Sequence, residues 1–535
     1  PGSTLMPTNL KFITHRYGGG WGTDFGDSYH IGPGADGTLI VPFLSTAKNL
    51  TYELDGSVRK MPGTAKLNAS VLESGSTVMG LYDYWRQGTI GTPLQRRVCH
   101  VGTKVKADQV DGVFVDIGTG FVSGAVPNYN TFDDLLILSN DASADVPKSW
   151  DQTTFQSLAG SPPNFSFSCT HKNRVWAAGV IGYPSRLYYS VNLDPEDWTG
   201  GTSGSIDIDP SDGDMITGLA SFRNELWVFK GPYKGSIHRI AGSSPSEFTR
   251  STFIRGLGAS WQTGIFELPN DLGFISPRGT VHSLVATDRY GDYEQSSLSL
   301  PINQTLRTTL ANAYYRNYRA ATDLDSGYTL IAVTPSGTTT NTKILMMDFR
   351  FMALGEPKPR WALWDTYGAA SITPVIDTAN RLRLFAGGYD GYVYKLDQAD
   401  RTHNSGAISM QATTPFLSYG LEHFEKSLYA VGINLSPKND NALTFRWTRD
   451  NQTEQSATVT QGGSAVLGPW STNQFTLDTS TLGGTRYAPR YIDLETGGSF
   501  RSVQYTISDA ITSSDAQVAS FTTAVTTDGF STENA

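Results

Sequence analysis

Apolar and polar positions alternate along most of this chain in short runs, the pattern of half-buried β-strands. Over residues 173–400 the runs come in pairs, and turn-forming residues separate them. The opening turns begin at residues 173, 224, 270, 326 and 380, in steps of 51, 46, 56 and 54 residues. The predicted strand pairs are 173–178 with 185–190, 224–229 with 235–240, 270–275 with 279–284, 326–331 with 343–348, and 380–385 with 391–396.

A strand-only repeat of about 50 residues is typical of β-propeller blades. Each blade is a small meander that buries its faces only against its neighbours. Two further units precede the five pairs, around residues 80–85 and 134–138. The pattern therefore predicts an all-β protein with a β-propeller of about seven blades over residues 76–402.

The flanking segments lack this period. Residues 1–75 are rich in glycine and contain the hairpin-type turn Asp55-Gly56, so we expect an N-terminal arm with closing strands. Residues 403–535 hold alternating runs at irregular spacing, which predicts a β-sandwich-like C-terminal domain. Its last residues, 525–535, are polar, and we expect a frayed tail.

The composition agrees with an all-β fold and restricts the function. Charged residues make up only 17% of the chain and glycine contributes 55 residues, which excludes helical bundles, and the apolar content excludes wholesale disorder. The net charge of −9 argues against a protein that grips DNA. Cys99 and Cys169 have no paired spacing and predict reduced thiols. We expect neither a membrane anchor nor a signal peptide.

Motifs for catalysis are missing from the sequence. It contains no HExxH, no GxSxG, no GxxxxGK[ST] and no GxGxxG that links a strand to a helix. We therefore expect no enzyme, no catalytic residues, no cofactor and no metal. The stretch Asp207–Asp214 resembles a calcium loop, but Gly218 stands where a bidentate Glu would complete it. We interpret it as an Asx-rich turn between blades, with a cation site as the alternative.

One basic segment stands out between residues 86 and 106, which contain no acidic residue. Three interpretations are open: a lining of a DNA channel, a contact with an acidic neighbouring subunit, or the solvated outer faces of two strands, which we favour. The candidate channel or interface residues are Arg86, Arg96, Arg97, Lys104 and Lys106.

Four short motifs together resemble tailed-phage virion proteins of the tail hub or nozzle type, described in some phages as packaged-DNA stabilisation proteins. The resemblance covers roughly residues 50–450. The motifs are Gly-Ser-Val-Arg-Lys-x-Pro-Gly at 56–63, Tyr-Ser-x-x-x-Asp-Pro-x-x-Trp at 189–198, Asp-Gly-Asp-x-Ile-x-Gly-Leu at 212–219 running into Leu-x-Val-Phe-Lys at 226–230, and Asp-Gly-x-Val-x-Lys-Leu at 390–396.

The resemblance implies a structural protein of the virion tail, assembled in the host cytoplasm. Such a protein forms a six-fold ring that extends or closes the DNA exit channel below the portal and adaptor, and it carries tail fibres or spikes. Viral double-stranded DNA would pass through the channel without sequence-specific binding. The alternative function is a glycan-binding or glycan-cleaving β-propeller protein.

Overall fold

A computed structural model describes residues 10–24, 28–29, 33–88, 93–290, 297–436, 442–450, 452–460, 488–493, 498–512 and 515–530 of the chain. The fold is all-β, with 51% of the residues in strands and 6% in helices. The chain forms two compact units. The propeller unit comprises Ala65–Arg350 and Tyr367–Asp397, and the smaller unit comprises Pro1–Thr64, Phe351–Thr366 and Gln398–Ala535.

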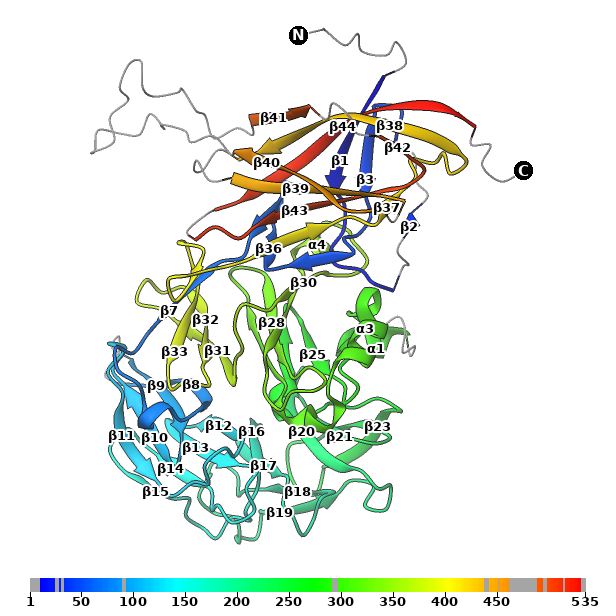
Figure 1. The fold of residues 1–535 in the computed structure, drawn as a ribbon. Coiled ribbons are helices and arrows are strands. Elements are labelled where there is room, and N and C mark those ends of the chain that lie inside the picture. Colours follow the sequence, from blue (N-terminus) through cyan, green and yellow to red (C-terminus); the bar gives the residue numbers. More distant parts are fainter. Residues whose placement is uncertain are drawn as a thin grey trace. The chain divides into compact units, whose positions relative to one another are not determined.

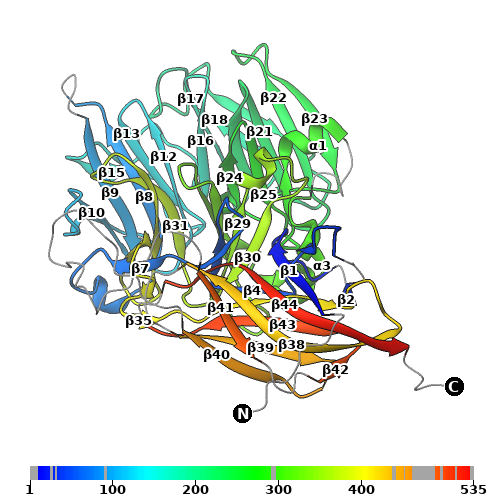
Figure 2. The same ribbon diagram turned by 90° about the horizontal axis from the view of Figure 1, so that it is seen from above.

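The propeller unit consists of antiparallel meanders that follow one another along the chain, as the colours from blue to green show (Figure 2). Four meanders have four strands each. The first consists of β8 (Val78–Arg86), β9 (Leu94–Val101), β10 (Lys104–Asp108) and β11 (Val115–Thr119), and the second of β12 (Pro127–Phe132), β13 (Leu135–Asn140), β14 (Lys148–Trp150) and β15 (Phe155–Ser157). The third consists of β16 (Phe167–His171), β17 (Arg174–Ala178), β18 (Arg186–Tyr189) and β19 (Gly204–Asp207), and the fourth of β20 (Met215–Phe222), β21 (Glu225–Gly231), β22 (Ser236–Ala241) and β23 (Thr249–Arg255).

Three shorter meanders follow these four in the same unit. They are β24 (Ile265–Leu268), β25 (Asp271–Ile275) and β26 (Val281–Ser283); β27 (Arg319–Asp323), β28 (Tyr328–Val333) and β29 (Lys343–Asp348); and β31 (Ser371–Ile376), β32 (Leu382–Gly387) and β33 (Val393–Gln398). First strands of successive meanders lie beside one another, from β8 through β12 and β16 to β20 (Figure 1). The fold is a β-propeller in which six blades are recognised.

Asparagine in the left-handed backbone region forms four of the opening turns, each of which joins the first strand of a meander to the predicted strand pair that follows. Asn173, Asn224, Asn270 and Asn380 have φ angles of 57°, 63°, 57° and 56°. Asparagine tolerates this region better than most residues, and two-residue hairpin turns require it. All five predicted strand pairs are confirmed, as β17 with β18, β21 with β22, β25 with β26, β28 with β29, and β32 with β33.

The sequence pattern did not predict the helical insertion between β26 and β27. It contains α1 (Leu284–Tyr290), η3 (Leu300–Ile302), α3 (Asn303–Thr309) and η4 (Asn312–Asn317). Other short helices in the described residues are η1 (Glu73–Gly75), η2 (Gln262–Gly264) and α4 (Arg350–Ala353). Along the chain, the insertion follows the third strand, where the four-stranded meanders have their fourth strand. The repeat that contains it is therefore longer than the others.

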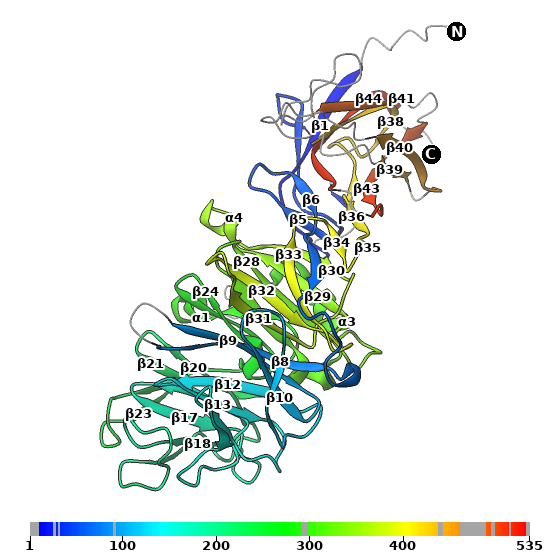
Figure 3. The same cartoon turned by 90° about the vertical axis from the view of Figure 1, so that its left-hand side faces the viewer.

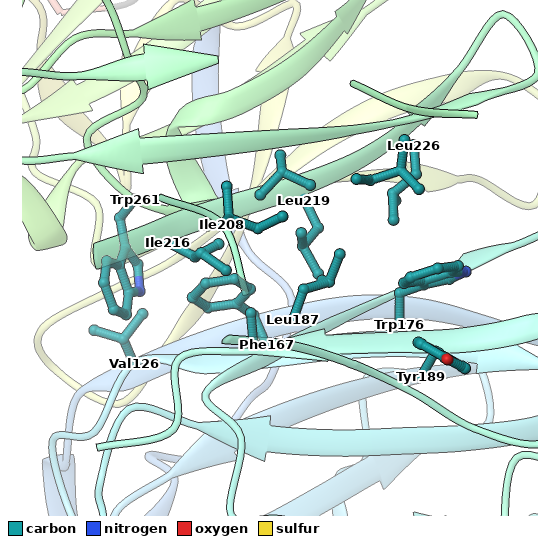
Figure 4. Close-up of a cluster of buried hydrophobic side chains, with 13 residues drawn as sticks. Val126, Phe167, Trp176, Leu187, Tyr189, Ile208, Ile216, Leu219, Leu226 and Trp261 are labelled. Atoms are coloured by element: carbon teal, nitrogen blue, oxygen red, sulfur yellow. The ribbon is translucent and has the colours of Figure 1, made fainter. Parts of the chain in front are cut away.

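The core of the propeller unit forms where successive meanders face each other. Phe167 and Trp176 from one meander pack with Leu219 and Leu226 from the next (Figure 4). Each of these side chains is at most 1% exposed. Burying a side chain of this size contributes about 1.5–3 kcal/mol, so the inter-blade layers stabilise strands that could not persist alone.

The smaller unit contains two sheets built from distant parts of the chain (Figure 3). In the first sheet β1 (Lys11–Tyr17) pairs with β44 (Gln517–Phe530), which also pairs with β38 (Phe424–Leu435). The other strands of this sheet are β3 (Thr38–Val41), β5 (Leu50–Tyr52), β6 (Val58–Lys60), β41 (Ala488–Asp493) and β42 (Ser499–Phe500).

The second sheet of this unit centres on β43, and aromatic side chains join the two sheets. Phe521 of the first sheet packs against Tyr505 and Phe445 of the second, with ring centroids 5.1 and 5.8 Å away. Its strands are β2 (Ser28–Tyr29), β4 (Thr46–Lys48), β30 (Arg360–Trp364), β36 (Met410–Thr413), β37 (Phe416–Leu417), β39 (Ala442–Arg449), β40 (Gln455–Thr460) and β43 (Val503–Asp509). A further short strand, β34 (Thr402–His403), pairs with both β7 (Gly63–Lys66) and β35 (Gly406–Ala407).

The structure divides the chain differently from the sequence-based domains. Residues 10–64 do not form a separate arm, because β1 pairs with β44 and β6 pairs with both β5 and β44. Residues 351–366 also group with the smaller unit. The prediction of a frayed tail from residue 525 is wrong as far as residue 530, since β44 continues there beside β38; residues 531–535 lie outside the described residues.

Candidate functional site

The basic segment lies on one meander of the propeller unit. Arg86 ends β8, Arg96 and Arg97 lie on β9, and Lys104 and Lys106 lie on β10. Consecutive strands therefore carry all five cations. Their neighbours decide whether they form a positive surface.

Arg97 is neutralised inside the sheet. Its Nε lies 3.0 Å from Oδ1 of Asp108, and its Nη2 bonds the other carboxylate oxygen. Arg97 is 5% exposed and Asp108 is fully buried. Asp108 also accepts the Gly112 N–H at 2.9 Å. This paired guanidinium cannot meet a DNA phosphate without breaking the buried pair.

Lys104 and Lys106 share two acidic partners. Lys104 Nζ lies 2.7 Å from Asp116 Oδ2, and Lys106 Nζ lies 2.7 Å from Glu73 Oε1. Lys106 also bonds Asp116, and Lys104 also lies 3.2 Å from Glu73. Side-chain hydrogen bonds from the two lysines hold the pKa values of Glu73 and Asp116 below their usual range. The two lysines and two acids form a locally neutral group.

Arg86 and Arg96 differ from the other three cations. Arg86 Nη1 donates to the carbonyl of Asp151, and Arg96 Nη1 donates to the carbonyl of Gln95 at 2.9 Å. Neither makes an ion pair with any residue that the structure describes. The structure thus places the five predicted residues on one sheet but leaves only these two as uncompensated cations.

The aspartates of the Asp207–Asp214 stretch each have protein partners. Asp207 pairs with Arg186, and Asp209 pairs with Arg250 and Arg255. Asp212 binds the Lys230 ammonium. Across the described residues no group of three or more His, Cys, Asp or Glu is placed to hold a metal ion. The carboxylates therefore act in turns and ion pairs between strands.

A cavity of about 170 Å³ lies among the first strands of the meanders, and sequence reasoning missed it. Its lining comes from β8, β12, β24, β27, β31 and the short helix η2. Arg319, at the start of β27, is the one charged residue among the described residues of the lining, and it is 4% exposed. The only sequence signal was an arginine beginning the otherwise uncharged run Arg319–Thr322.

Comparison with known proteins yields remote structural neighbours only. No family model matches the chain, and no curated protein sequence matches it. A solved structure of YCF48 bound to D1 peptide aligns at a TM-score of 0.38 and 9% identity, covering 63% of this chain and 97% of that one. Raptor from Chaetomium thermophilum aligns at 0.40 and 11% identity, covering 63% of this chain but only 29% of Raptor.

The consecutive antiparallel meanders of the larger unit define the class of protein: the chain is a β-propeller protein. No helix in the described part of the chain is long and apolar enough to span a membrane.

Proposed function

We propose that this chain is a structural protein of a bacteriophage tail, of the hub or nozzle type, without catalytic activity. The proposal rests on the four motifs that resemble this family. If the protein is structural, the polar residues of these motifs should stabilise the fold. If it were an enzyme, they should line a cleft.

The observation that carries the proposal is the buried ammonium of Lys230, the last residue of the third motif. Lys230 is fully buried, and its Nζ lies 2.8 Å from both carboxylate oxygens of Asp212, which begins the same motif. The ammonium also donates to the carbonyls of Ile208 and Asp209, at 2.8 and 2.9 Å. These bonds satisfy a charge that would otherwise be costly to bury.

Asp214 of the same motif organises the adjacent turn. Its carboxylate accepts N–H groups from Tyr233, Lys234 and Gly235, at 2.8, 3.0 and 2.7 Å. The motif thus joins β20 to the loop between β21 and β22. The charged groups of the motif therefore bond to other groups of the protein, which supports a structural role for the motif.

The first motif has the same character in the smaller unit. Arg59 Nε and Nη2 make two bonds to the carboxylate of Asp515, at 2.8 and 2.6 Å. The turn before it is held by Asp55, whose Oδ1 accepts the Ser57 N–H at 2.9 Å. The motif therefore ties the beginning of the smaller unit to its C-terminal strands.

The proposal extends to the architecture. On this proposal all seven meanders are blades. The contacts of β31 with β8 and β27, of β24 with β27, and of η2 with both β20 and β27 support a closed order of the first strands. The two sheets of the smaller unit form a β-sandwich joined by the Phe521 cluster. Copies of the chain form a six-fold ring beneath portal and adaptor, carry fibres or spikes, and let the viral DNA pass.

The test is whether virions contain this chain. Mass spectrometry of purified phage particles is expected to find its peptides, and gold-labelled antibody against it is expected to mark the tail below the portal. Absence of the chain from purified particles, while it remains abundant in the lysate, would overturn the proposal.

A further inference from the structure

We propose that the cavity among the first strands of the propeller is an anion site, in which Arg319 binds a small oxyanion of the carboxylate or phosphate class. This inference does not depend on the proposed tail function. It rests on the charge, the free donors and the size of the cavity.

In the part of the chain that the structure describes, Arg319 forms hydrogen bonds through only one of its nitrogens. Nη1 donates to the carbonyls of Arg316 and Tyr318, at 2.7 and 3.1 Å, and to Oγ1 of Thr263 at 3.2 Å. Among the described residues, Nε and Nη2 have no acceptor. These bonds hold the guanidinium in place at one end, and the rest of its planar fork remains for a ligand.

The guanidinium of Arg319 lacks a directly bonded carboxylate among the described residues, and Asp141 acts on it only through a longer-range electrostatic interaction that raises its pKa. Arg319 makes no ion pair with any carboxylate in the described part of the chain. Burial lowers the pKa of the guanidinium to about 10, and the side chain still carries its proton at neutral pH. Burying a charge without a partner of opposite sign is unfavourable. An anion that enters the cavity would pair with the guanidinium and offset this cost.

The remaining residues that line the cavity are compatible with a bound anion, because they include a second hydrogen-bond donor and no described acidic side chain. Asn128 accepts the Ser168 N–H at 2.9 Å through Oδ1, which leaves its Nδ2 as a second donor without a described partner. The stacked rings of Tyr82 and Tyr129, 5.4 Å apart, supply an apolar wall.

The dimensions indicate a small ligand. A cavity needs about 10–15 Å³ of accessible space to hold one water molecule, so a cavity of about 170 Å³ has room for phosphate or a short dicarboxylate. The guanidinium fork matches both groups, because it can form two parallel hydrogen bonds to two oxygens. A lysine at this position would supply charge without that geometry.

The test measures binding by the full chain with isothermal titration calorimetry and thermal shift. The probes are sodium phosphate and sodium succinate, each compared with sodium chloride at equal ionic strength. We expect one saturable site per chain for at least one probe, and the probe that binds more tightly identifies the class of oxyanion. Absence of saturable binding for both probes would overturn the proposal.

Two variants and a control connect binding to the cavity. Arg319→Gln should weaken the affinity at least tenfold, with folding checked by circular dichroism. Asn128→Asp keeps the acceptor for Ser168 and places a carboxylate in the lining, so it should abolish binding in a folded protein. Arg96→Gln removes an uncompensated arginine outside the cavity and should leave binding unchanged. Equal affinity in all four proteins would assign the ion to the surface and contradict the proposal.

Discussion

Lys60 and Asp509 form a buried ion pair across 449 residues of sequence: Nζ lies 3.1 Å from Oδ2, and neither side chain is exposed. The ammonium also donates to the Ile511 carbonyl at 2.8 Å, and Asp509 Oδ1 accepts the Ile511 N–H at 3.0 Å. Lys60 belongs to the first of the motifs that resemble tail proteins. The pair therefore fastens that motif to the C-terminal strands of the smaller unit.

Removing one member of this fully buried pair should cost much more than removing the partly exposed neighbouring arginine. Lys60→Met leaves the Asp509 carboxylate buried alone and should lower the free energy of unfolding by about 3–5 kcal/mol. The adjacent Arg59 is more exposed, so Arg59→Met should cost about 1 kcal/mol or less. Urea denaturation of both variants measures the difference.

The double variant Lys60→Met with Asp509→Leu separates the pair from simple loss of packing. Because it removes both charges, it should recover most of the stability that Lys60→Met loses. A double variant as unstable as the single one would contradict this account of the pair.

The two adjacent arginines of the basic segment should respond differently to charge reversal. Arg97→Glu sets two carboxylates against each other in the sheet interior and should prevent normal folding of the propeller unit. Arg96→Glu changes a side chain whose described bond goes only to the Gln95 carbonyl and should change stability by about 0.5 kcal/mol or less. Thermal unfolding followed by circular dichroism tests this; equal effects of the two variants would refute it.

The stability of the propeller unit should fall in mild acid through His100. Burial lowers the pKa of His100 to about 4, against an ordinary value near 6.5. Between these pH values the unfolded chain binds the proton more readily than the folded chain, so the contribution is complete above pH 6.5 and is lost towards pH 4. At pH 5 the loss is about 2 kcal/mol.

The variant His100→Leu removes this titration and keeps an apolar side chain against Phe121, whose ring centroid lies 5.4 Å from that of His100. Chemical denaturation at pH 8 and pH 5 should show a smaller drop for the variant than for the wild type. Parallel drops in the two proteins would exclude His100 as the cause.

The inter-blade core should be sensitive to truncation at Leu226. This side chain is fully buried in the layer between two meanders, so Leu226→Ala should lower the free energy of unfolding by about 2–5 kcal/mol. Val113→Ala changes a side chain that is 63% exposed and serves as the control. Urea denaturation that gives similar values for the two variants would contradict the core assignment.

The strands and turns of the propeller could be predicted from the sequence, because local residue preferences determine them. The hairpins of the propeller repeat at turns such as Asn173 and Asn224, whose backbone conformation few other residues tolerate, so spacing alone located the strands. The pairing of β1 with β44 was not predictable, because the two strands lie more than 500 residues apart in the sequence. A short alternating run indicates a strand but does not indicate which strand it pairs with.

The basic segment shows the same limit. Residues 86–106 contain no acid, which suggested a positive surface, but Asp108, Asp116 and Glu73 lie just outside that window and neutralise three of the cations. Arg319 carried no motif at all. Its importance comes from burial without an acidic partner, which only the three-dimensional arrangement can reveal.

Native mass spectrometry of the full chain tests the central claim, that this propeller protein is the repeating unit of a tail ring. We expect a closed assembly with six times the chain mass of 58.1 kDa, formed either alone or on mixing with portal complexes. A protein that stays a monomer under both conditions and binds glycans would contradict it.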